Sequence, residues 1–215
     1  SGVYNNIFVT NDQVKSIIDN KHIQGVSLTG SERAGAAVAQ IAGAALKKVV
    51  LELGGSDPFI VLKDADIDQA VTCAFIGRFG NAGQACNAAK RMIVDADIYD
   101  EFVEKLAYKI ESLQPNDPLS RETFLGPLSS SQALETIQAQ YDNAVNQGAT
   151  VLVAGGKITK SGAWFKPALL ADITPSMQAY HDELFGPVAV VYKASDNEEM
   201  IRLANDTSFG LGACI

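Results

Sequence analysis

The sequence of 215 residues predicts an α/β fold. Stretches with the period of an amphipathic helix alternate with short runs rich in Val, Ile and Leu, and turn residues separate them. The hydrophobic content of 47% is enough for a sizeable core, and no internal repeat or low-complexity stretch interrupts the alternation. Alternation of this kind is typical of the α/β class.

The first part of the chain is expected to contain helices and strands in close succession. Each helix begins at or after a residue whose side chain can accept a hydrogen bond from a free N–H of the first turn. Each strand is a short, mostly apolar run between turn residues. In order, the elements are a helix from Asn11 or Asp12, a strand Gln24–Thr29, a helix opened by Gly30-Ser31 and ending near Leu46, strands Lys48–Leu53 and Phe59–Leu62, a helix Asp66–Gly80 and a strand Arg91–Val94.

The rest of the chain continues the same alternation. The longest helical pattern is strongly amphipathic, and a Gly-Gly pair closes the strand that follows it. In order, the elements are a helix from about Ile98 to Leu113, a turn-rich stretch Gln114–Leu119, a helix Ser129–Gln147, strands Thr150–Ala154 and Val188–Tyr192, and a helix Asn197–Asn205.

Both ends of the chain are expected to be cut from a longer protein. The sequence opens on Ser1 without an initiator Met, and 212–215 is apolar, like a strand interrupted midway. Natural termini are more often polar and frayed.

Charge and composition disfavour several classes of partner. The formal net charge of −8 and the pI of about 4.7 oppose binding to nucleic acid or to anionic lipid. No apolar run approaches the roughly 20 residues that a membrane helix needs, and no basic-then-apolar leader opens the sequence. We therefore expect a cytoplasmic protein that acts on a small molecule and has no nucleic-acid or membrane partner.

The cysteines suggest one reactive thiol rather than a disulfide framework or a metal site. There are three, widely spaced, which favours a reducing compartment, and the two histidines leave no cluster of zinc ligands. Cys86 follows a polar, Gly-containing turn where a thiol can be accessible, although a cysteine taken alone is more often buried and inert. Cys73 lies in an apolar helix and Cys214 in an apolar strand, so both are expected in the core.

Two segments place polar groups where a strand ends. At Thr29-Gly30-Ser31, small residues let the backbone approach a ligand, and the following helix offers free N–H groups to phosphate. An ordinary helix cap is the alternative. Glu52 ends an apolar strand just before two glycines, which makes it a candidate base, with a solvated strand-end carboxylate as the alternative.

Glu183 and Phe185 stand two residues apart, before Gly186-Pro187. In an extended segment both side chains point to the same face. The carboxylate could then accept hydrogen bonds from sugar hydroxyls while the ring packs on a flat heterocycle. The alternative is a charged loop leading into a strand.

A triplet of alternating aspartates favours helix capping over metal binding. Asp64, Asp66 and Asp68 are spaced as in a calcium loop, but Gln69 stands where that loop needs Gly and Phe75 where it needs Glu. We therefore expect Asp66 to cap the following helix.

Taken together, four motifs resemble the aldehyde dehydrogenase superfamily. Thr-Gly-Ser at 29–31, Glu-Leu-Gly-Gly at 52–55, Gly-Gln-x-Cys at 83–86 and Glu-x-Phe-Gly-Pro at 183–187 occur in that family's order and at its approximate spacings. The resemblance runs from about Gly2 to Ile215 and covers less than half of a typical member. The stretch Leu-Gly-Gly-Ser-Asp-Pro-Phe-Ile-Val, with Ser56 where many members have Lys, is similar to bacterial succinate-semialdehyde dehydrogenases.

The resemblance implies NAD(P)-dependent oxidation of an aldehyde to a carboxylic acid. Cys86 would add to the aldehyde, with its backbone N–H helping to hold the oxyanion, and Glu52 would activate the water that hydrolyses the thioester. Members that pass the acyl group to coenzyme A lack this glutamate, so Glu52 favours hydrolysis. The cofactor is NAD or NADP, and the residues implied around it are Thr29, Gly30, Ser31, Leu53, Gly54, Glu183 and Phe185.

The substrate is less well defined by the motifs. Gly80 stands where better-known succinate-semialdehyde enzymes have an Arg for the substrate carboxylate. Arg78, Lys90 or Arg91 could supply a cation instead, and the alternative is that they are solvated basic residues at the surface. We expect a semialdehyde such as succinate semialdehyde. A general aliphatic or other semialdehyde dehydrogenase, or a non-catalytic member that keeps the fold, is the alternative, and the presence of both Cys86 and Glu52 disfavours the last.

The resemblance also implies two domains. Residues 1–53 would be part of a Rossmann-like NAD(P)-binding domain, and 54–215 would be an α/β catalytic domain that carries the thiol and is truncated at its C-terminal end. The family's oxyanion Asn and phosphate-side Lys would lie before Ser1, so the 215 residues alone are expected to be inactive. The full-length parent is expected to be a homodimer or homotetramer.

Overall fold

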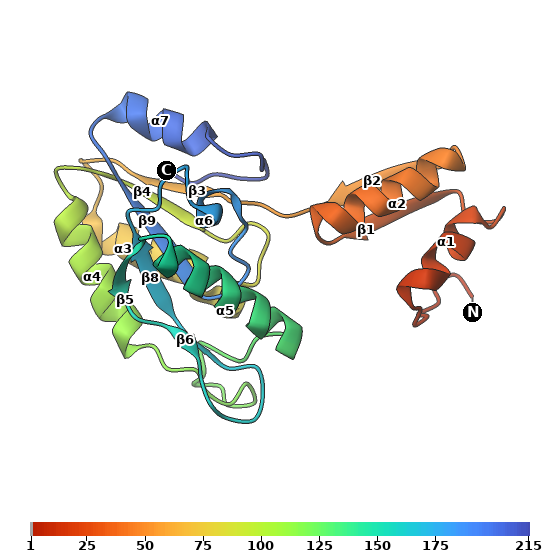
Figure 1. Cartoon of the computed structure of the whole chain (residues 1–215), viewed down its shortest axis with the longest axis horizontal. Coiled ribbons are helices and arrows are strands. Elements are labelled where there is room, and N and C mark those ends of the chain that lie inside the picture. Colours follow the sequence, from red (N-terminus) through yellow and green to blue (C-terminus); the bar gives the residue numbers. More distant parts are fainter. Residues whose placement is uncertain (1) are drawn as a thin grey trace. The chain divides into compact units, whose positions relative to one another are not determined.

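The computed structural model describes residues 2–215 and has the α/β architecture that the sequence predicts (Figure 1). Its contacts divide the chain into two compact units, one ending at Gly54 and the other comprising Gly55–Ile215. None of the helices within 2–215 is long and apolar enough to cross a lipid bilayer.

The first unit contains a strand–helix–strand arrangement. Strands β1 (Gly25–Thr29) and β2 (Lys48–Glu52) pair in parallel, and helix α2 (Glu32–Ala44) connects them. A parallel pair needs a crossover of this kind, because its strands cannot be joined by a tight turn. Helix α1 (Asn11–Asp19) packs against α2, and a small apolar cluster that includes Ile18 lies beneath them.

The second unit is built on a five-stranded sheet in the order β3-β4-β9-β8-β5. The first four strands of this order are parallel, and β5 pairs with β8 in the antiparallel direction. A separate two-stranded hairpin is formed by β6 and β7. The bounds are β3 Pro58–Val61, β4 Arg91–Asp95, β5 Thr150–Val153, β6 Gly156–Lys157, β7 Phe165–Lys166, β8 Ala168–Ala171 and β9 Val188–Ala194.

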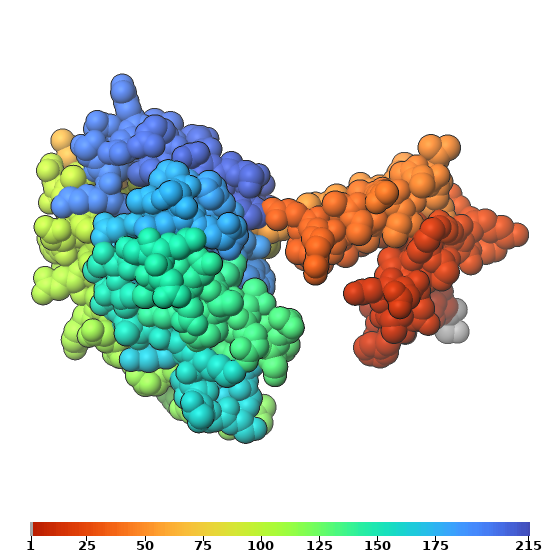
Figure 2. All heavy atoms as spheres, in the orientation of Figure 1, coloured from red at the N-terminus to blue at the C-terminus, as the bar shows by residue number. Residues whose placement is uncertain are grey.

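Helices cover this sheet. Helix α4 packs against β4, β5 and β8, whereas α7 packs against β3, β4 and β9. In the space-filling view the side chains of α5, in green, fill part of the face turned to the viewer (Figure 2). The bounds are α3 Ile67–Phe79, the 3₁₀ helix η1 Gly80–Gly83, α4 Tyr99–Ser112, α5 Ser131–Asn146, α6 Gln178–His181 and α7 Asn197–Asn205.

The core lies around the central strands. Every residue of β4 and of β8 is buried, and so are all but one of the residues of β9. Strands buried on both faces need continuous apolar sequence, which explains the Val-rich run of β9. Each fully buried aliphatic side chain contributes about 1.5–3 kcal/mol of transfer free energy, so these strands form a rigid base for the loops at their ends.

All the helices and strands expected from the sequence are present, with ends within about two residues of the expected bounds. The short elements β6, β7, β8 and α6 were not expected. Of these, β8 could have been found, because Ala168–Ala171 is an apolar run that follows Pro167. The other three are two to four residues long, and their positions depend on contacts made after the chain has folded.

Three neighbouring parallel strands have their N-terminal ends on the same side of the sheet. Pro58 at the start of β3 pairs with Arg91 at the start of β4, and Arg91 pairs with Val190 near the start of β9. The three segments that lead into these strands therefore meet at one place. They carry Gly55, Cys86 and Glu183, respectively.

Candidate active site

In the first unit, the predicted residues gather at the carboxyl end of the two-stranded sheet. Thr29 pairs with Glu52, and the backbone N–H of Gly30 donates to the carbonyl oxygen of Glu52 over 3.0 Å. Ser31 caps α2, and its hydroxyl accepts a hydrogen bond from the N–H of Ala34 over 3.3 Å. The turn after β1 and the end of β2 therefore lie beside the N-terminus of α2, where ligands commonly bind in α/β sheets.

A close contact within this unit positions the segment after β2. A Cβ atom on Gly35 would lie 2.6 Å from Cδ2 of Leu53, so α2 approaches this side chain more closely than any larger residue would allow. Leu53 is therefore held by the helix, while the neighbouring Glu52 side chain stays exposed.

In the second unit, Cys86 follows a turn in an unusual backbone conformation. Asn81 and Ala82 have φ values of 52° and 55°, and Gly83 has a φ of 70°. Asn tolerates the left-handed region and its side chain donates to the carbonyl oxygen of Gln84 over 3.0 Å, whereas Ala82 is strained there. Such strain persists only where surrounding contacts enforce it. The thiol that follows is free and half-buried.

Lys90 holds the backbone of this turn from inside the protein. Only 2% of the residue is exposed. Its ammonium donates to the carbonyl oxygens of Ala85 and Cys86 over 2.9 and 2.7 Å, and it forms an ion pair with Glu183 at 3.0 Å. Burial lowers the pKa of Lys90, and the hydrogen bond to Glu183 opposes this shift.

Glu183 and Phe185 both lie against Lys90, in an irregular segment rather than a strand. Oε1 of Glu183 contacts Lys90 and accepts a hydrogen bond from the N–H of Gly55 over 3.1 Å. The ring of Phe185 lies 5.9 Å from the Lys90 ammonium, measured to its centroid. Within residues 2–215, no hydrogen bond uses Oε2 of Glu183, so this oxygen can accept from a ligand.

Arg78 joins the Cys86 turn to the segment that carries Glu183. Its side chain is fully buried and donates to the carbonyl oxygens of Gly83, Leu184, Gly186 and Val188. Burial lowers the pKa of Arg78 to about 9, and attraction to Glu183 opposes this shift. The guanidinium therefore stays charged at neutral pH and keeps all of its donors.

The backbones of these two loops also touch. A Cβ atom on Gly83 would lie 2.4 Å from the carbonyl oxygen of Gly186, which Arg78 holds in place. A side chain at Gly83 is therefore excluded by its φ and by its neighbour. Sequence reasoning did not identify the packing roles of Gly55, Gly83 and Arg78, because their partners come from distant parts of the chain.

The structure does not support a role for Arg78, Lys90 or Arg91 in holding a substrate carboxylate. All three are buried and bind backbone carbonyl oxygens. Arg91 donates to those of Ser56, Leu203 and Ala204 over 2.8, 2.6 and 2.9 Å. The other expectation, that these residues are solvated at the surface, is wrong too, because each cation satisfies loop carbonyl oxygens inside the fold.

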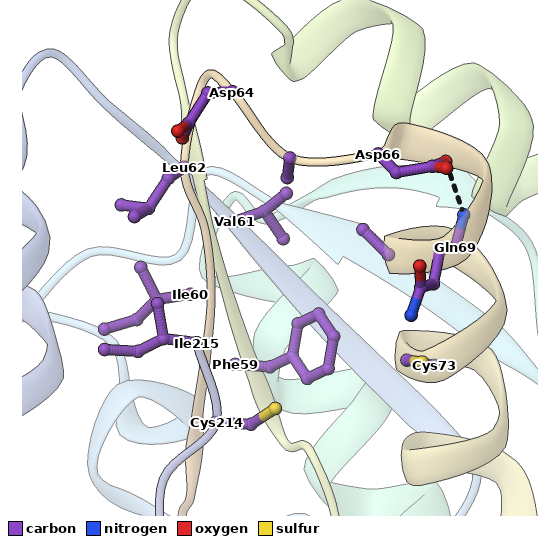
Figure 3. Close-up of a pocket in the computed structure, with 12 residues that line it drawn as sticks. Phe59, Ile60, Val61, Leu62, Asp64, Asp66, Gln69, Cys73, Cys214 and Ile215 are labelled. Atoms are coloured by element: carbon purple, nitrogen blue, oxygen red, sulfur yellow. Dashed lines mark hydrogen bonds between the residues drawn. The ribbon is translucent and has the colours of Figure 1, made fainter.

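The expectation that Cys73 and Cys214 belong to the core was also wrong, because both are exposed. They line a pocket of about 360 Å³ between β3 and α3, with Phe59 and Ile215 (Figure 3). Apolar and polar residues are spread evenly around α3, so its sequence does not indicate which face turns outward. No residue of the Cys86 turn lines this pocket.

The aspartate triplet serves the helix that follows it. Asp66 caps α3, and its carboxylate accepts a hydrogen bond from the N–H of Gln69 over 3.0 Å. Across residues 2–215, no group of three or more His, Cys, Asp or Glu side chains is arranged to hold a metal ion.

Comparisons with known proteins agree with the motifs. The model of the "Aldehyde dehydrogenase family" matches residues 1–215. The chain is 52% identical to a succinate-semialdehyde dehydrogenase [NADP(+)] of Deinococcus radiodurans over 214 residues, which are 100% of this chain and 45% of that protein. It is 45% identical to the succinate semialdehyde dehydrogenase [NAD(P)+] Sad of Escherichia coli, with 100% and 46% covered.

A solved structure gives the same result. The succinic semialdehyde dehydrogenase of Streptococcus pyogenes, in complex with NADP+, superposes with a TM-score of 0.93 at 43% identity, covering 96% of this chain and 46% of that one. The chain thus spans less than half the length of the relatives that it matches. With the family model matched from end to end and relatives at 52% and 45% identity, the chain belongs to the aldehyde dehydrogenase family.

Proposed function

We propose that the protein carrying this chain is an NAD(P)-dependent aldehyde dehydrogenase that oxidises a semialdehyde to a carboxylic acid. The names of its relatives support this activity. The observation that carries the proposal is the convergence of Gly55, Cys86 and Glu183 at one edge of the sheet, where buried Lys90 contacts both the Cys86 backbone and Glu183. A free thiol in a backbone held this firmly is suited to nucleophilic catalysis.

Cys86 is the proposed nucleophile. Its sulfur forms a bond to the aldehyde carbon, and the π electrons of the carbonyl group move to the oxygen, giving an oxyanion beside the Cys86 N–H. Hydride loss from the same carbon then leaves a thioester on Cys86. The nicotinamide ring of the cofactor, when bound, supplies the hydride acceptor.

Glu52 is the proposed base for the second half of the reaction. It takes a proton from water, the hydroxide oxygen adds to the thioester carbon, and the carbon–sulfur bond breaks to release the acid and the thiolate. Its exposed carboxylate at the end of β2 is free to contact water.

The residues proposed to hold the cofactor fit its chemistry. Oε2 of Glu183 can accept hydrogen bonds from ribose hydroxyls, and the exposed ring of Phe185 offers an apolar face. In the first unit, the N-terminus of α2 offers N–H groups to phosphate. The full proposed set is Thr29, Gly30, Ser31, Leu53, Gly54, Glu183 and Phe185.

The substrate class is proposed from the relatives, which are named for succinate semialdehyde. Since Arg78, Lys90 and Arg91 are buried and bind backbone carbonyl oxygens, we expect another group of the complete protein to bind the carboxylate of this substrate. General aliphatic aldehydes are the alternative substrate class. The ratio of kcat/KM for succinate semialdehyde to that for butyraldehyde decides between them, and a ratio above about ten shows that a carboxylate-binding cation is present.

The domain roles and the oligomeric state are proposed from the family resemblance. We assign cofactor binding to residues 1–53 and the thiol chemistry to 54–215, and we expect the complete protein to be a homodimer or homotetramer. Free cysteines throughout 2–215 support a reducing compartment such as the cytoplasm.

The nucleophile is tested with Cys86→Ser in the complete protein. Aldehyde-dependent formation of NAD(P)H should be lost, while binding of the cofactor, measured by titration calorimetry, stays close to wild type. Cys73→Ser is the matched control, because Cys73 is a free, exposed thiol and should be dispensable. Substantial turnover by Cys86→Ser would rule out this role.

A further inference from the structure

The Lys90 side chain is placed to act on the proposed nucleophile through the backbone. An ammonium group has three donors. In the folded protein its three acceptors are the carbonyl oxygens of Ala85 and Cys86 and the carboxylate of Glu183. Every donor is therefore used, so that Lys90 has no donor left for a substrate.

Two donors, the Lys90 ammonium and the N–H of Ala88 over 3.2 Å, hold the carbonyl oxygen of Ala85 and thereby fix where the Cys86 N–H points. The carbonyl group of Ala85 and the N–H of Cys86 belong to one peptide unit, which is planar and trans, so the two groups point in opposite directions. Because this carbonyl oxygen faces the buried Lys90, the N–H is directed away from Lys90, and of the two donors only Lys90 carries a charge. Within residues 2–215, no backbone hydrogen bond uses this N–H as a donor.

The same contact changes the strength of that N–H. A cation bound to an amide oxygen draws electron density toward the oxygen and makes the N–H a better donor, since linked hydrogen bonds polarise one another in a low-dielectric interior. Lys90 therefore both orients and strengthens the donor nearest to the Cys86 sulfur along the chain.

We propose that Lys90 is a positioning residue that aims and polarises the Ala85–Cys86 peptide, so that the Cys86 N–H stabilises the oxyanion formed when the thiolate adds to a carbonyl group. Through its ion pair, Lys90 also ties this peptide to Glu183. The proposal rests on the proposed function in one respect, namely that Cys86 is the nucleophile.

Two thiol reagents separate this effect from general loss of structure. Acylation of Cys86 by p-nitrophenyl acetate forms a tetrahedral oxyanion and expels p-nitrophenolate. Alkylation by iodoacetamide displaces iodide directly and forms no oxyanion. The ratio of the two rate constants, measured at Cys86 by peptide mass mapping in the complete protein, cancels changes in exposure and ionisation of the thiol.

The variants are Lys90→Met, which removes the charge, and Lys90→Arg, which keeps it. Loss of a whole oxyanion donor costs about 10²–10³-fold in rate, so weakening this donor in Lys90→Met should lower the acylation-to-alkylation ratio by about 10–10²-fold. Lys90→Arg should restore most of it. Lys105→Met is the matched control, because Lys105 forms surface ion pairs with Asp68 and Glu101 and should leave the ratio unchanged.

A ratio in Lys90→Met within about threefold of wild type would overturn the proposal, whether or not both rates fall. If Lys90→Met does not fold, Lys90→Gln, which keeps donors but not the charge, is measured in its place. A ratio in Lys90→Gln within about threefold of wild type would then overturn the proposal. Failure of the proposed function looks different. In that case Cys86→Ser would still oxidise aldehydes, whereas failure of the Lys90 proposal alone leaves Cys86→Ser inactive.

Discussion

A Cβ atom on Gly55 would lie 2.6 Å from the carbonyl oxygen of Cys86. This oxygen cannot move freely, because Lys90 binds it over 2.7 Å. The position of the Cys86 carbonyl oxygen therefore allows only glycine at residue 55, although the two residues are far apart in the sequence.

Gly55→Ala should displace the Cys86 turn while leaving the fold intact. A misplacement of about 1 Å can cost roughly 10²-fold in rate, and a loss of about 10–10²-fold in kcat is expected. The measurement is steady-state oxidation of aldehyde by the complete protein. Gly77→Ala is the control, since its Cβ would meet only Ala89 Cβ at 3.5 Å, and Ala at this helical position should stabilise the fold by about 0.5–1 kcal/mol. Equal activity in both variants would contradict the close approach of Gly55 to Cys86.

Glu52→Gln should stop the reaction after the thioester has formed. The amide keeps the shape of the side chain but cannot take a proton from water, so steady-state turnover should fall by about 10²–10⁴-fold. Rapid mixing with excess aldehyde should show a burst of NAD(P)H equal to the concentration of sites. Asp12→Asn, another acidic residue of the first unit, should turn over normally. Normal turnover by Glu52→Gln would mean that another group activates the water.

Arg78→Met should be strongly destabilising. It leaves the carbonyl oxygens of Gly83, Leu184, Gly186 and Val188 without their buried donor, which should lower the free energy of unfolding by about 3–5 kcal/mol. Urea denaturation gives this value. Arg202→Met, which removes an exposed guanidinium paired with Glu199, should cost less than about 1 kcal/mol. Similar losses in the two variants would contradict the clamp that Arg78 forms.

In the folded 215-residue chain, Cys73 and Cys214 should both react with iodoacetamide, because both are exposed. Cys73→Ala should change the free energy of unfolding by less than about 0.5 kcal/mol, as for most surface substitutions. Peptide mass mapping and thermal unfolding provide the two measurements. Protection of both thiols until the protein unfolds would restore the original expectation that they lie in the core.

Local sequence was sufficient to predict most elements of this fold. Capping residues such as Asp66 and the apolar run of β9 depend on contacts within a few residues, so their patterns are visible in the sequence. Helix α3 shows the limit of such patterns. Its apolar residues are spread around the whole helix, so only the packed structure shows that Cys73 faces outward.

The candidate site could be predicted only in part. The motifs pointed to Cys86, Glu52 and Glu183, and the structure places Cys86 and Glu183 in the same loop cluster. The supporting residues carry no comparable signal. Lys90 was considered as a partner for substrate, but two of its three acceptors are carbonyl oxygens, which every residue has and which no sequence pattern distinguishes.

The long reach of Arg78 has a consequence for the protein while it is being synthesised. Arg78 and its acceptor on Val188 are 110 residues apart. At about 5–20 residues per second, translation separates the appearance of these two partners by roughly 5–20 s. During this interval the Cys86 turn exists without its clamp, so the nascent chain exposes a flexible thiol that the finished protein holds in place.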